Sequence, residues 1–566
     1  MLGFVSWLIK FVLVVPCLGL LGLWDRLRVG RKAVLRVSLG PASARPQDRI
    51  GDVPETVALL RAVRDDPSVR AVVIDVRNVP GGQAALQDLR ATMLELRSHG
   101  RTVLVHVHGL SWRELMVASA ADRVWMSPAG EVFLTGLGAR LTYYGPALEK
   151  VGLEADLVSV GRFKTFGEPY LRGHPSRANR EQLGELLGDL QAQIVEYVSE
   201  GRGLDPESLL TLLGRAPLSA DDALRAGLVD DVLYPDASSD AARELLGEGL
   251  RVVPARAYKK VRDWQRRLRL VLDARPSLAV VHLDGPIVQG QEGSSRSVSI
   301  DSDQVVPVLR SLGADPTVRG VVLAVNSPGG SALASDLIAR AVQCLGTQKP
   351  VVAAFGDVAA SGGYYLSAPA SEIVARDGTV TGSIGVVGGK VVVGRALARL
   401  GIHSESVDVG PDAGFLGPFE PFDGSQRKRF QASLERAYVR FLSIVSAGRR
   451  RPVRAIEPFA AGRVWTGRQA LDRGLVDHLG GLDVAIERVA VKASVSPSNV
   501  AIRDVRFRPS RFLFLSQLMQ TGIRGLVRDG VREVLLERMG AGGHILQHAW
   551  RKPNEPLALL PWDIDT

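Results

Sequence analysis

Short apolar runs alternate with segments of helical periodicity along most of the chain. In the second half, four runs are dense in Val, Ala and Leu, which is typical of buried parallel strands, and two longer segments between them repeat apolar residues at helical spacing. Strand and helix in alternation predict βαβ units around a largely parallel sheet. Strands are expected at residues 278–283, 320–325, 350–355 and 372–375, and helices at residues 302–312 and 332–345.

The same pattern occurs twice in the chain. Residues 66–74 (DPSVRAVVI) correspond to residues 315–323 (DPTVRGVVL), and three further matches follow in the same order at nearly the same spacing. The sequence therefore predicts a tandem duplication. The further matches are residues 80–82 with 328–330, residues 151–153 with 400–402, and residues 227–230 with 474–477.

These patterns predict an α/β protein with two tandem domains and an apolar N-terminal anchor. The stretch between the copies is basic and helical in pattern, and so is the last part of the chain. That last part fits a membrane surface or packing against the body equally well. The predicted parts are an anchor at 1–25, a first repeat at 26–250, a helical connector at 251–275, a second repeat at 276–500 and a basic helical tail at 501–566.

Residues 2–24 are almost wholly apolar, and a helix of this length just spans a bilayer core of about 30 Å. No small-residue cleavage motif follows, which favours an uncleaved anchor over a signal peptide. A lipoprotein at Cys17 and a buried helix of the soluble body are the alternatives. Basic residues between Arg26 and Arg36 follow the stretch, and the positive-inside rule would keep the body cytoplasmic.

The composition of the 566 residues is that of a folded protein, with 46% hydrophobic and 23% charged residues. It excludes collagen and long disorder. The two cysteines, Cys17 and Cys344, are too few for a disulfide framework or a thiolate zinc site. The net charge of +10 is typical of a protein that binds nucleic acid or an anionic membrane surface. Because no nucleic-acid motif accompanies the charge, we expect a membrane rather than a nucleic-acid partner.

Two glycine-rich turns follow predicted strands of the second repeat. Residues 326–331 (NSPGGS) precede a helix, and residues 359–365 (AASGGYY) place Ser361 at a tight turn that opens the next one. Either turn alone is an ordinary strand-to-helix connection. Together they suit a serine nucleophile beside backbone N–H groups that stabilise an oxyanion.

A serine nucleophile needs a base, and none of the nine histidines lies in a convincing setting. His106 and His108 alternate on a predicted strand and are interpreted as structural. No metal-ligand spacing or P-loop is present, so we expect no metal, no cofactor and no use of ATP. The remaining option is a lysine that burial keeps neutral, and Lys164 lies between Phe163 and Phe166. A surface lysine is the alternative there.

Four motifs together resemble the signal peptide peptidase A (protease IV) family in its long, duplicated form. They are residues 327–331 (SPGGS), 359–365 (AASGGYY), 381–385 (TGSIG) and 163–169 (FKTFGEP). Around the lysine, Phe163 and Thr165 replace the Tyr and Ser of the family's motif. The resemblance covers about residues 50–490 and implies the fold of the Clp protease and crotonase superfamily.

The resemblance also implies roles for individual residues. Ser361 would be the nucleophile, Lys164 the general base, and Gly330 and Gly362 would supply the N–H groups of the oxyanion hole. Ser383 would orient the lysine. Shifting Ser361 back by the spacing of the repeat leads to Trp112, and shifting Lys164 forward leads to Ala413. Each copy therefore keeps half of the dyad, which predicts one site per chain at the junction of the copies.

The implied protein is a membrane-anchored serine endopeptidase that degrades cleaved signal peptides and other unfolded apolar peptides without ATP. Its partners would be peptide substrates and the lipid bilayer, and it would form a homotetramer. The family places a single-pass protein in the bacterial inner membrane with a periplasmic body, the opposite side from that indicated by the basic cluster. The alternatives are a non-catalytic membrane scaffold and an acyl-CoA enzyme of the crotonase type.

Overall fold

The structure is a computed structural model that describes most of both repeats. The predicted anchor at 1–25 and nearly all of the predicted helical tail lie outside the described residues. Within the described part, no helix combines the length and the apolar character needed to cross a membrane. The described residues are 32–40, 47–247, 249–272, 275–290, 298–410, 412–496, 499–507 and 557–559.

The chain divides into two compact units. Unit one contains residues up to 138 together with residues 188–275, and unit two contains residues 139–187 together with the second repeat. Residues 139–187 were predicted as part of the first repeat, yet they group with the second. The division falls inside the long helix α8 (Arg177–Arg202).

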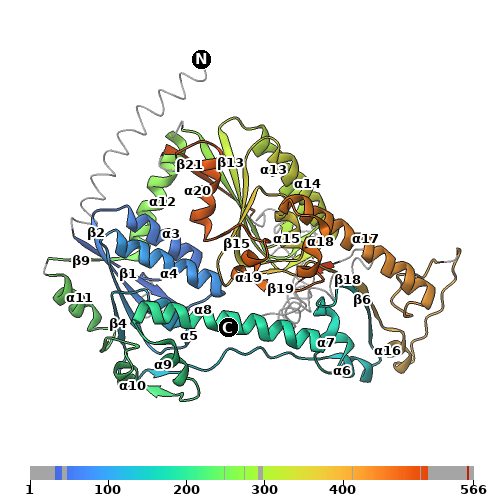
Figure 1. Cartoon of the computed structure of the whole chain (residues 1–566), viewed down its shortest axis with the longest axis horizontal. Coiled ribbons are helices and arrows are strands. Elements are labelled where there is room, and N and C mark those ends of the chain that lie inside the picture. The colour runs from blue at the N-terminus through green and yellow to red at the C-terminus, as the bar shows by residue number, and fades with distance from the viewer. Residues whose placement is uncertain are drawn as a thin grey trace. The chain divides into compact units, whose positions relative to one another are not determined.

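Unit one is built on a six-stranded sheet in which every pair of neighbours is parallel, as predicted (Figure 1). Residues 251–254 were predicted to begin a helical connector, but they form an edge strand beside β1, where Val253 is buried in the main core. The strands, in spatial order, are β8 (Asp231–Val232), β4 (Arg123–Met126), β3 (Thr102–Val107), β2 (Val69–Val76), β1 (Ala33–Leu39) and β9 (Arg251–Pro254).

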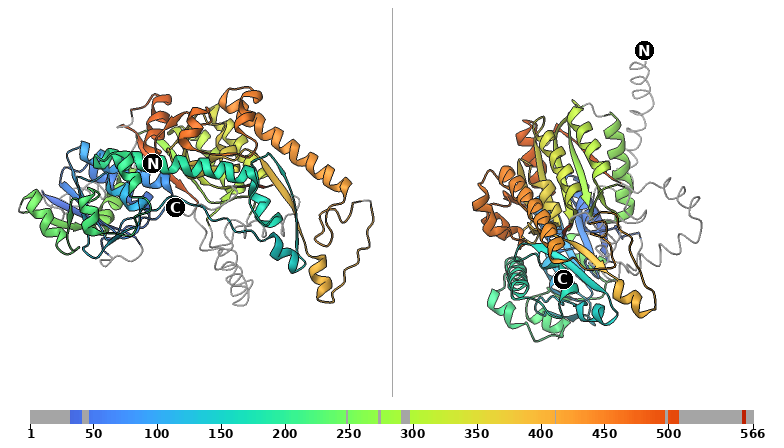
Figure 2. Two further views of the ribbon diagram at one scale, coloured as in Figure 1. Left: turned by 60° about the horizontal axis from the view of Figure 1, so that its bottom comes forward. Right: turned by 90° about the vertical axis from the view of Figure 1, so that its right-hand side faces the viewer.

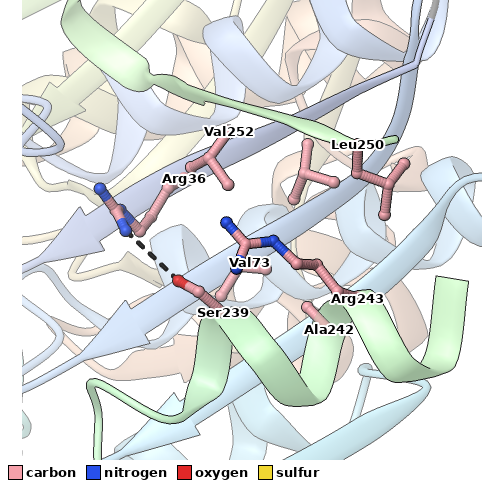
Figure 3. Close-up of a pocket in the computed structure, with 8 residues that line it drawn as sticks. Arg36, Val73, Ser239, Ala242, Arg243, Leu250 and Val252 are labelled. Atoms are coloured by element: carbon pink, nitrogen blue, oxygen red, sulfur yellow. Dashed lines mark hydrogen bonds between the residues drawn. The ribbon is translucent and has the colours of Figure 1, made fainter. Parts of the chain in front are cut away.

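Helices cover both faces of this sheet. Leu35, Ile74 and Val105 point into the main core, against α3 and α4. On the opposite face α11 packs over a smaller cluster, and Arg36 of β1 donates to Ser239 of α11 (Figure 3). The helices are α3 (Val53–Arg64), α4 (Gln83–Ser98), α5 (Trp112–Ala118), α9 (Pro206–Thr211), α10 (Ala220–Arg225), α11 (Ser238–Leu246) and α12 (Ala255–Leu272), and the strands β5 (Glu131–Val132) and β7 (Leu218–Ser219) pair beside them.

The main sheet of unit two contains the four strands predicted for the second repeat. Helix α20 packs on one face, and α13, α14 and α15 lie on the other. Residues 501–506, predicted to begin the helical tail, form a strand parallel to β10 instead. The strands are β19 (Val464–Thr466), β17 (Val380–Gly382), β15 (Val351–Ala360), β13 (Val318–Ser327), β10 (Ser277–Asp284) and β21 (Ala501–Arg506), with β16 (Glu372–Ala375) and β20 (His478–Leu479) beside β15.

The helices of unit two include both predicted ones. Helices α13 and α14 fall at the expected places. The set is α6 (Gly145–Lys150), α7 (Glu168–Leu171), α13 (Ser302–Ala314), α14 (Ala332–Gly346), α15 (Gly362–Ser367), α16 (Gly394–Arg399), α17 (Gly424–Arg449), α18 (Val453–Ile456), α19 (Gly467–Asp472) and α20 (Leu482–Lys492), with 3-10 turns η2 (Thr165–Gly167) and η3 (Glu457–Phe459).

A second sheet in unit two explains why residues 139–187 belong there. Strand β6 (Glu154–Val160) pairs antiparallel along its whole length with β18 (Val386–Val392). Helix α17 packs against both strands (Figure 2). The spatial order of this sheet is β12 (Ile300–Asp301), β11 (Ile287–Val288), β14 (Gly329–Ser331), β22 (Leu557–Leu559), β18 and β6.

Candidate active site

Ser361 occupies a strained turn between β15 and α15. Its φ of 54° lies in the region that non-glycine residues rarely adopt, and it is fully buried. Its N–H donates to the carbonyl of Gly382 at 2.8 Å. Although it stands where a helix cap stands, its side chain makes no capping bond, so the Oγ is available for another partner.

That partner is Lys164, which reaches Ser361 from the segment after β6. The Nζ of Lys164 lies 2.7 Å from the Oγ of Ser361. It also donates to the Oγ of Ser383 at 3.0 Å and to the carbonyl of Ser383 at 3.2 Å. The structure thus brings together all three side chains that the sequence singled out, and all three belong to unit two.

Backbone contacts and side-chain hydrogen bonds hold the segment that contains Lys164 in place. Phe163 donates its N–H to the carbonyl of Ala461 at 2.8 Å. A Cβ on Gly462, whose φ is +82°, would meet the backbone N of Lys164 at 2.4 Å, so this position requires glycine. From α8, the Nε2 of Gln182 donates to the carbonyl of Phe163 at 3.2 Å and to the Oγ1 of Thr165 at 2.9 Å. Gln182 was not predicted as a site residue, because a single glutamine within a helical pattern belongs to no recognisable motif.

The environment of Lys164 favours the neutral amine. The side chain is buried, and this desolvation lowers the pKa of Lys164 well below its usual value. A neutral amine keeps a lone pair, which can accept the proton of the Ser361 hydroxyl while its N–H groups donate to Ser383. The arrangement therefore suits proton abstraction from Ser361. The surface-lysine alternative is wrong.

The two glycine-rich turns lie against each other. A Cβ on Gly362 would be 3.2 Å from the Cα of Gly329 in β14. Gly330 has φ +155°, and a Cβ there would be 2.1 Å from the carbonyl oxygen of Ile287 in β11. Gly362 is the first residue of α15, where a backbone N–H has no partner within its helix. The structure thus brings the two glycine-rich turns into contact next to Ser361.

A strand from the end of the chain pairs with one edge of β14. Residues 557–559 run antiparallel to Gly329–Ser331, with Ala558 opposite Gly330. Leu557 also pairs with Val387 of β18. An extended peptide segment therefore fits between β14 and β18, next to the turn that carries Ser361.

The positions that the repeat relates to Ser361 and Lys164 do not reproduce this arrangement within the described residues. Trp112 begins α5, as Gly362 begins α15. The residue before it, Ser111, is extended, and its hydroxyl donates to the carboxylate of Glu114 in a capping box. Ala413 is exposed. The repeat spacing had pointed to Trp112, but a serine does stand before α5, and it serves as a helix cap.

Comparison with known proteins identifies the family of this chain. The sequence profile of peptidase family S49 matches residues 95–248 and 344–496, once in each predicted repeat and over more than half of the chain. These matches define a serine peptidase that contains the family's domain twice. The chain belongs to peptidase family S49.

The relatives in this family match most of the chain. "Serine protease SPPA, chloroplastic" of Arabidopsis thaliana is 30% identical over 87% of this chain and 73% of its own length. "Protease 4" of Salmonella typhi is 31% identical over 82% of this chain and 75% of its own. "Protease 4" of Haemophilus influenzae is 28% identical over 86% and 80%. The predicted resemblance to the duplicated form of this family is confirmed.

Solved structures give weaker similarity. A ClpP1 variant from Listeria monocytogenes aligns with a TM-score of 0.24 at 14% identity, covering 36% of this chain and 93% of its own. A variant of the 1510-N membrane-bound stomatin-specific protease reaches 0.27 at 15% identity, covering 44% and 98%. Scores this low support no inference about activity.

Proposed function

We propose that this serine peptidase is a membrane-anchored endopeptidase in which Ser361 is the nucleophile and Lys164 the general base. The observation that carries the proposal is the 2.7 Å separation of the Lys164 Nζ and the Ser361 Oγ, with both side chains buried. A lysine in this state can act as a base at a pH below the ordinary lysine pKa, because burial has lowered its own pKa. The strained turn at Ser361 aims the nucleophile.

The chemistry is acyl transfer in two steps. Neutral Lys164 takes the hydroxyl proton as the Ser361 Oγ attacks a peptide carbonyl carbon, and the N–H groups of Gly330 and Gly362 donate to the oxyanion. Each such N–H lowers the barrier by about 3 kcal/mol. Protonated Lys164 then gives its proton to the leaving amine. A water molecule attacks the acyl-enzyme carbonyl while Lys164 takes a proton from it. Protonated Lys164 then returns this proton to the Oγ of Ser361 as the acid product leaves.

Ser383 is proposed as a positioning residue. Its hydroxyl and carbonyl both accept from the Nζ of Lys164, which directs the remaining lone pair toward Ser361. Ser383 is fully buried and has a φ of 51°. Because such a backbone conformation is rare for serine, the position is held by its surroundings rather than by local preference.

The substrates proposed are signal peptides left in the membrane after secretion, and other unfolded apolar peptides. The pairing of residues 557–559 with β14 and β18 supports binding of an extended chain by added strand pairing. Only an unfolded segment can present its backbone in this way. No step of the proposed reaction calls for ATP.

The proposed setting is the bacterial inner membrane. Residues 1–25 would form a single-pass anchor with the body on the periplasmic side, and the peptidase would be a homotetramer with the Clp-protease and crotonase type of fold. The support is the family to which the chain belongs and the apolar character of residues 2–24. Peptides and lipid are its proposed partners, and nucleic acid is not.

The test uses the full chain purified in detergent. We expect it to cleave an apolar signal-like peptide without added nucleotide and to react with a fluorophosphonate probe. Ser361→Ala should lose both properties. Ser367→Ala is the matched control. This buried serine lies on helix α15, which begins directly after Ser361, and it has no proposed role. Its hydroxyl donates to the carbonyl of Gly363 at 2.7 Å.

Three outcomes would contradict the proposal. A folded wild-type protein that neither cleaves varied peptides nor reacts with the probe would be a membrane scaffold. Hydrolysis of an acyl-CoA thioester without peptide cleavage would favour the crotonase-type alternative. Cleavage that survives Ser361→Ala would place the nucleophile elsewhere.

A further inference from the structure

Three side chains with metal-binding chemistry meet in unit one, at the carboxyl ends of two neighbouring strands. Asp75 lies on β2, and its register partner on β3 is His106. His108 follows two positions later, so the two imidazoles share a face of the sheet. Asp75 lies two residues beyond Val73 on β2, on the face that α11 covers (Figure 3). Ligands of parallel α/β sheets commonly bind at this edge.

The distances between the potential ligand atoms lie on either side of the spacing expected around one ion. The Nε2 of His108 lies 2.7 Å from the Oδ1 of Asp75, and the Nδ1 of His106 lies 4.0 Å from the same oxygen. The three potential ligand atoms all lie within 4.8 Å of one another. Because zinc binds nitrogen and oxygen at about 2.0–2.2 Å, atoms on one tetrahedral ion stand about 3.3 Å apart. Small side-chain rotations would move the pair at 2.7 Å apart and the pair at 4.0 Å together to reach this spacing.

The hydrogen bonding of His106 fixes which of its nitrogens is free. Its Nε2 lies 3.0 Å from the carbonyl oxygen of Leu233, and because a carbonyl only accepts, the Nε2 carries the proton. In the neutral ring the Nδ1 then presents a lone pair. This atom is buried and has no hydrogen-bond partner among the described residues.

A buried lone pair that faces a carboxylate oxygen is unfavourable unless something positive lies between them. A backbone carbonyl that holds the far nitrogen of an imidazole is also the usual support of a metal-binding histidine. Beside Asp75, the Oγ of its register partner Ser38 is buried and likewise lacks a hydrogen bond within the described part of the chain. Two unsatisfied polar atoms thus flank one carboxylate.

The nature of the nearby charges narrows the choice of ion. The Nε of Arg77 lies 3.8 Å from the Oδ2 of Asp75, which weakens the attraction for a cation held by charge alone. Ca²⁺ and Mg²⁺ require several oxygen ligands, and this cluster supplies two imidazole nitrogens and one carboxylate. That donor set suits Zn²⁺ and related transition-metal ions.

We propose that Asp75, His106 and His108 bind a divalent transition-metal ion of the Zn²⁺ type, with a fourth position open to water. When the ion binds, it displaces the proton that His108 shares with Asp75, and that proton moves to the Nδ1 of His108 or to solvent. The sequence led us to expect no metal, because Asp75 is distant from both histidines along the chain. The site lies in unit one, whereas Lys164 and Ser361 lie in unit two, so the proposal does not depend on the peptidase mechanism.

The test is titration of the full chain with Co²⁺, followed by competition with Zn²⁺. The protein carries no polyhistidine tag and is first freed of metal with a chelator. We expect one ion per chain, with visible absorption of Co²⁺ bound to nitrogen ligands. His108→Ala and Asp75→Asn should each weaken binding at least about tenfold.

His282→Ala is the matched control. The Nε2 of His282 lies 3.1 Å from the Oδ1 of Asp504 in unit two, a histidine–carboxylate pair without a second imidazole. This variant should bind the ion like wild type. Circular dichroism and thermal denaturation report that each variant is folded. Asp75→Asn keeps the shape of the side chain and decides the matter if His108→Ala does not fold.

The proposal is overturned if the metal-free wild type binds no Co²⁺. It is equally overturned if His282→Ala weakens binding as much as His108→Ala does, or if Asp75→Asn binds as tightly as wild type. In those cases the lone pair of His106 is met by a water molecule or a proton.

Discussion

The buried amine of Lys164 gives the most direct test of the proposed dyad. Lys164→Met keeps the length and bulk of the side chain and removes the amine. It thereby removes the 2.7 Å contact with the Ser361 Oγ and both bonds to Ser383. Because the side chain is 2% exposed, no water reaches the vacated position without rearrangement.

The size of the effect follows from the role of a general base. Loss of such a group lowers kcat/KM by about 10²–10⁴-fold. In wild type the base acts only when neutral, so activity falls as the pH drops through the lowered pKa of Lys164. Below that pKa each pH unit removes about nine-tenths of the neutral amine, equivalent to about 1.4 kcal/mol. Lys164→Met should be slow and should lack this acid limb.

The assay measures the rate of fluorophosphonate labelling of Ser361, and of peptide cleavage, across the pH range. Lys349→Met is the control, because burial also lowers the pKa of Lys349, while its Nζ donates to the carbonyl of Leu312 at 2.7 Å. This variant should keep the wild-type profile. If Lys164→Met labels within threefold of wild type, or if wild type is inactive until the pH nears the ordinary lysine pKa, the reasoning about Lys164 is wrong.

Protein stability carries a second signature of the same lysine. Its folded-state pKa is lowered, so between that value and the unfolded value the unfolded chain binds one more proton. Over this window the lysine makes the free energy of unfolding rise by about 1.4 kcal/mol per pH unit as the pH increases. Denaturation of Lys164→Met should lack that contribution. An unchanged slope would mean that the amine is charged in the folded protein.

Three further changes probe the surroundings of the dyad. Ser383→Ala removes an acceptor of the buried Lys164 amine, and an unpaired buried donor costs about 1–3 kcal/mol. This variant should therefore lower kcat at least about tenfold with little change in KM. A change confined to KM would contradict the positioning role of Ser383. Gly330→Ala should abolish labelling of Ser361, because its Cβ meets the Ile287 carbonyl, whereas Gly346→Ala has open space and should not. Ending the chain at residue 556 frees the edge of β14 and should lower the KM for a short apolar peptide, and an unchanged KM would show that residues 557–559 do not compete with substrate.

The sequence predicts the parts of this fold that depend on local pattern. Strands β10, β13 and β15 and helices α13 and α14 appear where the apolar spacing placed them, since buried parallel strands are continuously apolar and the helices are amphipathic. Ser361 could be selected because a serine followed by two glycines at the end of a predicted strand is unusual. These features need no knowledge of distant contacts.

The parts that depend on distant pairing were not predictable. Strand β6 mixes polar and apolar residues, and nothing within it indicates β18 as its partner. For this reason residues 139–187 were assigned to the first repeat. Asp75 was missed as a neighbour of His106 because the two meet only through the register of β2 and β3. Motifs and local composition identify candidate site residues, but the pairing of the strands determines which of these residues come into contact.

The long separation of Lys164 and Ser361 along the chain also has a consequence for biosynthesis. The two residues are 197 positions apart, so Lys164 leaves the ribosome roughly 10–40 s before Ser361 at typical rates of synthesis. Strand β18, which pairs with β6 just before Lys164, follows later still. In the proposed mechanism, a chain whose synthesis has not reached Ser361 contains a base without its nucleophile. The order of the two residues along the chain would then delay peptidase activity until β18 (Val386–Val392) has been synthesised.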